Sequence, residues 1–219
     1  MTDPSLAATE LSRRRFDYET EGLDPADVDA DPMVQWRRWF DDAVGAGCTE
    51  PEAFVLSTTD AEGWPQSRYV LLRGADERGF AFYTNHDSAK GEQLSTDGRA
   101  AMLFGWLQLH RQVRIGVTAE RLPDDESDAY FASRPRGSQI GAWASPQSQP
   151  IPDRAWLEQR VEQMGSTFGD GPVLRPVFWG GWLLRPTWFE FWQGRPSRLH
   201  DRVRYTQADG GWHVVRLAP

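Results

Sequence analysis

The 219-residue sequence predicts a mainly β (α+β) fold, an antiparallel barrel with about three peripheral helices. Strand-length apolar or alternating runs recur from residue 53 to residue 122 and again from residue 179 to the C-terminus. Short turns separate most of these runs, and helical patterns precede and interrupt them. Many strands with short connections are typical of antiparallel sheets and barrels.

The N-terminal segment differs from the rest of the chain. Residues 1–30 are polar and punctuated by Pro, Gly and Asp, so we expect a flexible arm there, with one helical turn around Leu11–Tyr18. Residues 31–219 are expected to form a single domain. Asp31-Pro32 has the N-cap and first-turn pattern of a helix. Apolar residues then follow at helical spacing until Gly45 and Gly47: Met33, Trp36, Trp39, Phe40 and Val44.

The strands are predicted from runs rich in β-branched and aromatic residues. Turn residues at Glu62-Gly63 and Asp76–Arg78 separate the first three, and Ala208–Gly211 has the composition of a hairpin turn. The predicted strands are 53–58, 67–73, 79–85, 100–109, 112–122, one or two strands within 179–192, and the hairpin of 203–207 with 212–217.

Two further helices and a loop are predicted in the second half. Pro123 begins a helix that ends at Arg134-Pro135, because proline disfavours a helical conformation in the residue before it. Residues 137–152 are rich in Gly, Ser, Pro and Gln, and we expect a long functional loop there. Residues 153–168 predict an amphipathic helix whose inward residues are Trp156, Val161 and Met164.

Composition excludes several classes of protein. The 24 Lys and Arg residues against 32 Asp and Glu residues give a net charge of −8, which disfavours a general nucleic-acid binder. Cys48 is the single cysteine, so no internal disulfide can form and a reducing cytoplasm is expected. No run of 18 apolar residues predicts a membrane span, and acidic residues interrupt the segment where a signal peptide would be apolar.

Familiar cofactor and metal motifs are missing. The chain has no G-x-G-x-x-G at a strand-to-helix junction, no G-x-x-x-x-G-K-[ST], no H-E-x-x-H and no G-x-S-x-G. The four histidines are not paired at ligand spacing, so no metal site is expected. The arginines, however, are bunched, and guanidinium groups are suited to phosphate and carboxylate.

Three polar segments are candidate sites for anions. Ser133–Gln139 places two arginines just after a helix, and the alternative is that these arginines cap the helix end. Arg68 with Tyr83-Thr84 and Ser88–Lys90 is a second cationic group, or a solvated strand end. Arg198–Arg202 follows an aromatic strand, or is a turn with surface charges. Two anion sites with aromatic residues between them predict a phosphorylated planar cofactor and a phosphorylated substrate.

Ten segments occur in an order and spacing that resemble the pyridoxamine 5′-phosphate oxidase family. They are Ser67–Leu72, Tyr83–Asn85, Arg111–Val113, Tyr130–Pro135, Ser138–Trp143, Gln147-Ser148, Phe178–Gly181, Glu190–Gly194, Arg198–Arg202 and Arg216–Pro219. The resemblance covers residues 31–219, and Arg15 with Tyr18 resembles the Arg-x-x-Tyr of the family's N-terminal arm. It implies an FMN-binding split barrel, a homodimer with FMN in clefts between the subunits, and oxidation of pyridoxamine or pyridoxine 5′-phosphate by O₂ to pyridoxal 5′-phosphate with release of H₂O₂.

The resemblance also implies roles for individual residues. The catalytic residues would be Arg198 and His200, which would face the substrate ring, and Arg15 with Tyr18 would close over it. The substrate phosphate would be bound by Arg73, Tyr130, Arg134 and Ser138. The FMN contacts would be Arg68, Tyr69, Val70, Leu71, Leu72, Tyr83, Thr84, Lys90, Gln112, Gln147, Ser148, Trp192 and Arg202.

The chain departs from the family pattern at two positions. Arg73 stands where the family usually has Lys, and Ala89 stands where it usually has Arg, beside Lys90 at the implied FMN phosphate. Two other functions are compatible with the same fold. One is a flavin oxidase with another substrate, as in phenazine biosynthesis, and the other is a non-catalytic carrier of flavin or pyridoxal phosphate.

Overall fold

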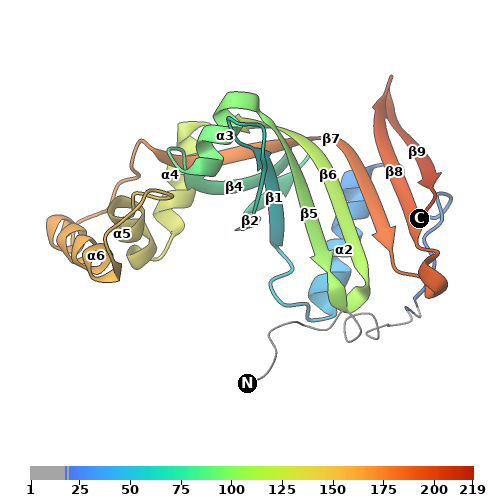
Figure 1. The fold of residues 1–219 in the computed structure, drawn as a ribbon, viewed down its shortest axis with the longest axis horizontal. Coiled ribbons are helices and arrows are strands. Elements are labelled where there is room, and N and C mark those ends of the chain that lie inside the picture. Colours follow the sequence, from blue (N-terminus) through green and yellow to red (C-terminus); the bar gives the residue numbers. More distant parts are fainter. Residues whose placement is uncertain (1–17, 19) are drawn as a thin grey trace.

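The computed structural model describes Tyr18 and residues 20–219. It confirms an antiparallel β fold with peripheral helices, in which one nine-stranded sheet curls into half of a barrel (Figure 1). Arg15 and the helical turn expected around Leu11–Tyr18, apart from Tyr18 itself, lie outside the described residues. No helix in the described part of the chain is long and apolar enough to cross a bilayer.

The helices and strands have the following bounds. The strands are β1 (Ala53–Thr59), β2 (Pro65–Leu71), β3 (Gly74–Asp76), β4 (Gly79–Asn85), β5 (Arg99–Trp106), β6 (Arg111–Arg121), β7 (Trp179–Gln193), β8 (Asp201–Ala208) and β9 (Gly211–Leu217). The α-helices are α2 (Pro32–Gly45), α3 (Ala89–Asp97), α4 (Asp124–Ser133), α5 (Arg136–Ala144) and α6 (Arg154–Phe168), and the 3-10 turns are η1 (Leu107–Leu109) and η2 (Pro196–Arg198).

Strand β7 organises the sheet. It pairs along most of its length with β6, while its first half pairs with β4 and its second half pairs with β8. The strand order β2-β1-β5-β6-β7 therefore divides at β7, with β4 and β3 at one end and β8 and β9 at the other. The 15 residues of β7 span about 46 Å at 3.3 Å per residue if fully extended, so β7 connects two distant ends of the molecule.

The main core lies between α2 and the concave face of the sheet. The side chain of Asp31 accepts a hydrogen bond from the backbone N–H of Met33, so the expected N-cap is confirmed. Trp36 and Trp39 then pack on Phe80, Phe104 and Phe191 from the strands. Burial of these aromatic side chains contributes on the order of 2 kcal/mol each and fixes which face of the sheet is left outside.

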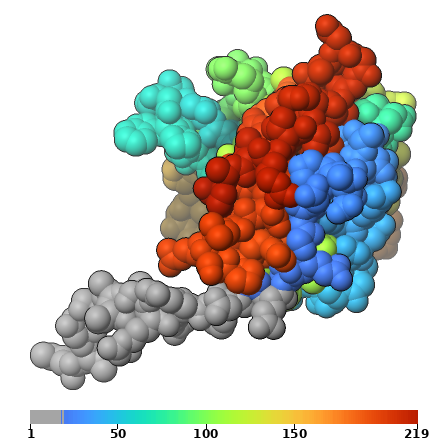
Figure 2. Space-filling view, turned by 90° about the vertical axis from the view of Figure 1, so that its right-hand side faces the viewer, coloured from blue at the N-terminus to red at the C-terminus, as the bar shows by residue number. Residues whose placement is uncertain are grey.

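Residues 20–30 fall in the range expected to be an arm, and they pack on the C-terminal hairpin β8–β9. Leu23 is buried in the core, and the Tyr205 hydroxyl donates to the backbone carbonyl of Asp29 at 2.8 Å. Arg216 donates to the backbone carbonyl of Leu23 at 3.0 Å. Figure 2 shows the same arrangement, with the first described residues in blue directly against the red C-terminal strands.

The helices α4, α5 and α6 project from the other end of the sheet (Figure 1). The prediction of a loop over 137–152 is wrong in its first part, because residues 136–144 form α5. Ile140 and Trp143 lie one turn apart and pack in the small cluster around Phe131 and Trp179, and this tertiary contact overrides the weak helix propensity of a Gly- and Ser-rich segment.

The inward face predicted for α6 is wrong at Val161, which is 39% exposed, whereas Trp156 and Met164 are half-buried. None of the residues of α6 is fully buried, because α6 packs on α5 at the tip of the projection and not over the sheet. The sequence analysis did not predict β3 or α3. It left open whether 179–192 forms one or two strands, and the structure shows one strand there.

Candidate active site

A cavity of about 380 Å³ lies where the helical projection meets the sheet. The end of β4, the start of β7 and helix α5 surround it. Its lining residues are Tyr83, Thr84, Asn85, Arg134, Ser138, Gly141, Ala142, Ser145, Gln147 and Trp179. Five residues implied by the family resemblance, two for the substrate phosphate and three for FMN, therefore meet in one place: Arg134, Ser138, Tyr83, Thr84 and Gln147.

The guanidinium of Arg134 is the cation of this cavity. Its Nη1 is buried and has no hydrogen-bond partner among the described residues. The guanidinium carbon lies 4.5 Å from the centre of the Trp179 ring, a cation–π contact that fixes the side chain without using its N–H groups. Burial lowers the pKa of Arg134, and the positive charge of Arg73 acts in the same direction. A buried donor without an acceptor is costly, so the site is suited to an anionic ligand.

Aromatic rings form one wall beside this cation. Tyr130 stacks on Tyr83 with ring centres 3.8 Å apart, and both rings lie nearly parallel to Trp179. Gln139 of α5 donates to the backbone carbonyls of Phe131 and Ala132 at the end of α4. These bonds hold the corner between the two helices, where Arg134 lies. The sequence analysis included Gln139 in the candidate anion segment Ser133–Gln139 but did not predict this role, because residues 137–152 were expected to form a loop.

A second cationic cluster lies next to the first and shares Thr84 and Gln147 with it. Lys90 Nζ donates to Thr84 Oγ1 at 3.2 Å and to Ser88 Oγ at 3.4 Å, and Thr84 Oγ1 donates to Gln147 Oε1 at 3.3 Å. Burial lowers the pKa of Lys90, and the positive charge of Arg68 lowers it further. The two groups of residues that the sequence marked as separate anion sites are thus neighbours.

The guanidinium of Arg68 is held by hydrogen bonds to two residues that the sequence analysis missed, Thr58 and Gln93. Its Nη1 donates to Thr58 Oγ1 at 2.5 Å and its Nη2 donates to Gln93 Oε1 at 3.2 Å. Thr58 also donates to Gln93. The missed signal is the start of α3, where Ser88 accepts a hydrogen bond from the backbone N–H of Gly91 as an N-cap. Recognising this helix would have placed Gln93 one turn after Lys90, near Arg68.

The chemistry of this donor set fits the phosphate of a flavin mononucleotide. In the described part of the chain no carboxylate forms an ion pair with Arg68 or Lys90. Two partly desolvated cations and a hydroxyl group without a counter-charge are the arrangement that binds phosphate by charge-assisted hydrogen bonds. The cluster therefore has the charge and donors that FMN requires.

The outer face of the sheet carries a larger hollow of about 610 Å³. Tyr69, Val70, Leu71 and Gln112 line it, together with apolar residues of β1 and β5. Tyr69 is 77% exposed. Leu72, by contrast, is buried with its side chain in the core, and Arg73 is exposed at the rim of another hollow. Of the implied FMN contacts, Tyr69, Val70 and Leu71 therefore line this hollow, whereas Leu72 points into the core.

The remaining predicted residues gather at the far end of β7. Tyr18 packs on the rings of His110, Trp192 and His200, with centres 4.3, 6.3 and 5.8 Å away. Gly194 is required there, because a Cβ would lie 2.8 Å from the Tyr18 ring. Thr20 and Arg195 form hydrogen bonds that tie this N-terminal segment to the loop after β7.

The two predicted catalytic residues belong to this loop. His200 Nδ1 accepts a hydrogen bond from the backbone N–H of Arg195 at 3.1 Å, so a neutral His200 carries its proton on Nε2 and is a donor there. Ser197 and Arg198 both have positive φ, +57° and +62°, and so does Ser148, at +71°. Such backbone strain costs on the order of 1–2 kcal/mol per residue and clusters at functional sites.

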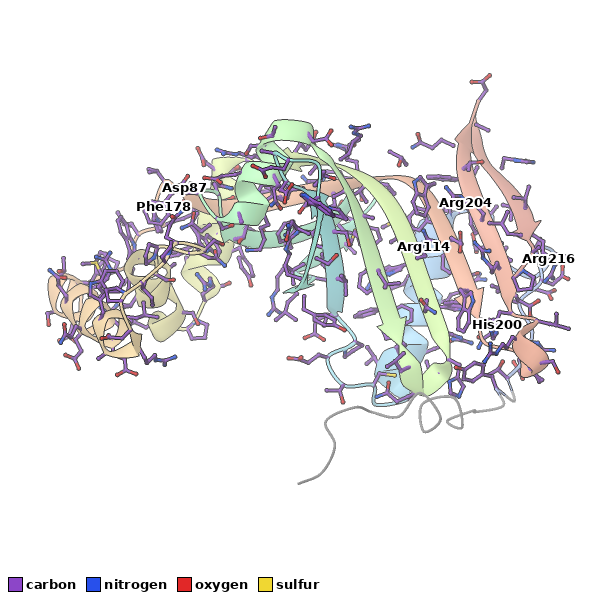
Figure 3. All side chains as sticks on the ribbon, in the orientation of Figure 1. Asp87, Arg114, Phe178, His200, Arg204 and Arg216 are labelled. Atoms are coloured by element: carbon purple, nitrogen blue, oxygen red, sulfur yellow. The ribbon has the colours of Figure 1, made fainter. Side chains whose placement is uncertain are left out.

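The two ends of β7 are too far apart to serve one small ligand. Trp179 beside Arg134 and Trp192 beside His200 are separated by 13 residues of strand, about 43 Å if extended. Figure 3 shows Phe178 and His200 at opposite ends of the molecule. The structure thus brings the phosphate-binding candidates together and leaves Arg198 and His200 apart from them within one chain.

Comparisons with known proteins agree with the fold. Residues 40–168 match the family described as Pyridoxamine 5′-phosphate oxidase, and residues 179–219 match its Pyridoxine 5′-phosphate oxidase C-terminal dimerisation region. The pyridoxine/pyridoxamine 5′-phosphate oxidase of Cupriavidus taiwanensis is 54% identical over 212 residues, which cover 96% of this chain and 100% of that protein. A second relative of the same name, from Ralstonia nicotianae, matches with the same identity and coverage.

Solved structures show the same fold. PhzG from Burkholderia lata, solved with tetrahydrophenazine-1-carboxylic acid, has a TM-score of 0.84 and 30% identity and covers 92% of this chain and 100% of its own. A pyridoxamine 5′-phosphate oxidase-related, FMN binding protein from Nostoc punctiforme, at 18% identity and TM-score 0.65, covers 84% of this chain and 97% of its own and shares the fold. The chain therefore belongs to the pyridoxamine 5′-phosphate oxidase family and is an enzyme of the oxidoreductase class.

Proposed function

We propose that the chain oxidises pyridoxamine 5′-phosphate and pyridoxine 5′-phosphate to pyridoxal 5′-phosphate, with FMN as cofactor and O₂ as electron acceptor. The amine substrate consumes one water and one O₂ and releases ammonia and H₂O₂, whereas the alcohol consumes one O₂ and releases H₂O₂. The half-buried guanidinium of Arg134, whose Nη1 is buried and unpartnered among the described residues, carries this proposal, because it lies in a cavity next to a second phosphate-type cluster. An enzyme with a phosphorylated substrate and a phosphorylated cofactor needs two such sites.

The residues of the chain divide the binding between them. Arg68, Lys90 and Thr84 hold the FMN phosphate, and Arg134 with Ser138 holds the substrate phosphate. Gln147 and Thr84 belong to both clusters and set the distance between the two anions. When bound, FMN accepts the hydride from the substrate and passes the electrons to O₂.

We propose that two copies of the chain complete each active site. Arg198 and His200 cannot reach a substrate held by Arg134 of the same chain, because β7 separates them. The outer face of the sheet is apolar around Tyr69 and Leu107, which are 77% and 76% exposed, so a second copy is suited to cover it. The match of 179–219 to a dimerisation region supports a homodimer.

In the loop after β7, Arg198 and His200 act on the ring of a substrate whose phosphate is held by the partner subunit. Arg198 would place its positive charge near the hydride acceptor, where negative charge develops as the electron pair of the C–H bond leaves the substrate. Its side chain is exposed, and its backbone lies in the left-handed region. The Nε2–H of His200 donates a hydrogen bond that orients the ring.

A second candidate is the oxidation of a phenazine precursor, which the similarity to PhzG in its complex favours. Such a substrate carries no phosphate, so it would leave Arg134 without its partner. The test is anaerobic mixing of the FMN-loaded protein with pyridoxamine 5′-phosphate, with pyridoxamine as the matched substrate without phosphate. We expect the yellow flavin absorbance to bleach with the phosphorylated compound and to return on admission of O₂. Protein that stays yellow with pyridoxamine 5′-phosphate would refute the proposal and favour a non-catalytic carrier of flavin or pyridoxal phosphate.

A further inference from the structure

A row of charged side chains crosses the outer face of the sheet two residues away from the implied flavin contacts. Gln112, Trp192 and Arg202 face one another across β6, β7 and β8 in register. The next row on the same face is Arg114, Glu190 and Arg204, because side chains alternate along a strand. Figure 3 shows Arg114 on β6 and Arg204 on β8, on either side of β7.

Glu190 is the centre of this row and is bound to three arginines. Its side chain is 3% exposed. Its Oε1 accepts from Arg202 Nε at 3.1 Å and from Arg202 Nη2 at 3.0 Å, and the nearest nitrogens of Arg114 and Arg204 are each 3.5 Å from its oxygens. Arg202 also donates through Nη1 to the backbone carbonyl of Ala218 at 2.8 Å. The guanidinium of Arg202 is thereby held on both edges.

The neighbouring tryptophan holds one flanking cation in place. The guanidinium carbon of Arg204 lies 4.0 Å from the centre of the Trp188 ring. Gly116 on the next strand makes room for Trp188, because any Cβ there would collide with the indole nitrogen. One carboxylate among three guanidinium groups leaves an excess of two positive charges, and Glu190 Oε2 has no hydrogen-bond partner in the described chain.

We propose that Glu190 is a positioning residue for Arg202 and that the row of Arg114, Glu190 and Arg204 tunes the reduction potential of the flavin. This inference rests on the proposed FMN function. A flavin gains negative charge density on reduction, so nearby cations favour the reduced form and a nearby carboxylate opposes it. Arg114 and Arg204 therefore raise the reduction potential of the flavin, and Glu190 lowers it.

The test is the midpoint potential of bound FMN in two kinds of variant. Glu190→Gln keeps the side-chain volume and the Oε1 acceptor but removes the negative charge. We expect it to favour reduced over oxidised flavin about tenfold, a positive shift of about 30 mV for a two-electron couple. Arg204→Gln and Arg114→Gln remove a positive charge, and we expect the potential to shift in the negative direction.

Arg185→Gln is the matched control. Arg185 also lies on β7 and pairs with Glu120 at 2.6 Å, but it is exposed and five residues from Glu190. We expect its potential to equal that of the unmodified protein. If Glu190→Gln is too unstable to purify, the two arginine variants still test the sign, since a general loosening of the site would not shift the potential according to charge.

Three outcomes are decisive. Opposite shifts for the glutamate and arginine variants would support the inference. Shifts of the same sign, or none beyond the Arg185→Gln control, in protein that binds FMN and oxidises substrate would overturn the inference and leave the proposed function intact. Unmodified protein that binds no FMN would overturn both.

Discussion

Arg134 is the residue on which the phosphate assignment depends. Replacing it with Gln removes the buried cation but leaves a side chain that fills part of its space. We expect the KM for pyridoxamine 5′-phosphate to rise about 10- to 150-fold, since a hydrogen bond to a charged group contributes about 1.5–3 kcal/mol. Retention of FMN should change little, because we propose that its phosphate is bound by Arg68 and Lys90. Steady-state kinetics and flavin content measure the two effects.

Arg136 provides the control for that experiment. It is two residues away and exposed, and its guanidinium donates to the backbone carbonyls of Gly169 and Gly171 outside the cavity. Arg136→Gln removes the same charge from the same corner of the fold, so it should leave the KM within about twofold. A KM that rises equally in both variants would mean that overall charge, not the cavity, attracts the substrate.

Because Ala89 stands where the family usually has Arg, we expect this chain to bind FMN less tightly than a typical relative does. It is exposed at the first position of α3, directly before Lys90. An arginine there would add a charged donor to the Arg68 and Lys90 cluster, near the N-terminus of a helix. We expect Ala89→Arg to bind FMN about tenfold or more tightly, measured by flavin titration of the apoprotein. Ala89→Gln, which adds length without charge, should change the affinity little, and an unaltered affinity in Ala89→Arg would contradict the assignment of this cluster.

At the scale of elements, His86 joins the end of β4 to the start of β7. Its backbone N–H donates to the carbonyl of Phe178, its ring packs on Trp182, and Gly180 lies against Nε2. Burial, together with the positive charges of Arg121 and Arg175, lowers the pKa of His86 to about 4. The native state therefore keeps this ring neutral at a pH where the unfolded chain is already protonated.

This difference predicts a pH dependence of stability. Between pH 6.5, the ordinary pKa, and about 4 the unfolded chain binds one more proton at this site, so the free energy of unfolding falls as the pH falls. The loss from His86 is at most about 1.4 kcal/mol per pH unit and stops growing below pH 4. Urea unfolding at several pH values should show a flatter profile for His86→Asn than for the exposed-site control His213→Asn. Identical profiles would refute the role of His86.

The sequence predicted the helices and strands correctly where signals from neighbouring residues were strong. Helix α2 was predicted from its Asp31 cap and its aromatic spacing, and the hairpin β8–β9 from its turn, because both depend on neighbours along the chain. Helix α5 was missed because packing of Ile140 and Trp143 on Phe168 and Phe178 decides its structure. Such contacts between distant segments have no local signal.

The candidate site also contains residues that were predicted from the sequence and residues that were not. The resemblance supplied Arg134, Ser138, Tyr83, Thr84 and Gln147, and the structure brings these five together. Gln93 and Glu190 were not predicted as site residues, since each acts by holding an arginine that is distant in sequence. The separation of His200 from Arg134 depends on the length of β7, which the sequence left open as one or two strands.

At the scale of the whole molecule, the sheet presents its two functional ends on opposite sides of one chain. The helical projection (Figure 1) carries the cavity at Arg134, and the opposite end carries Arg198 and His200 in the loop before the C-terminal hairpin, with Arg202 on its first strand, β8. The net charge of −8 is consistent with this arrangement, because the arginines that the sequence showed as bunched lie in separate clusters within an acidic molecule. A location in the cytoplasm stays a prediction from the single Cys48.

A site shared between two copies has a direct test by complementation. Arg134→Ala damages one end of each chain and His200→Ala damages the other, so each homodimer alone has two defective sites. A heterodimer of the two variants has one site with both defects and one site with neither, by the two-fold symmetry of the pair. Co-expression with two different affinity tags isolates this heterodimer.

The activity of that purified heterodimer tests the central claim. If the cavity at Arg134 and the loop at His200 come from different chains, the heterodimer should show about half the turnover of the unmodified dimer, with one of its two sites intact. A heterodimer as inactive as its two parents, while still carrying FMN, would contradict a site built from two chains.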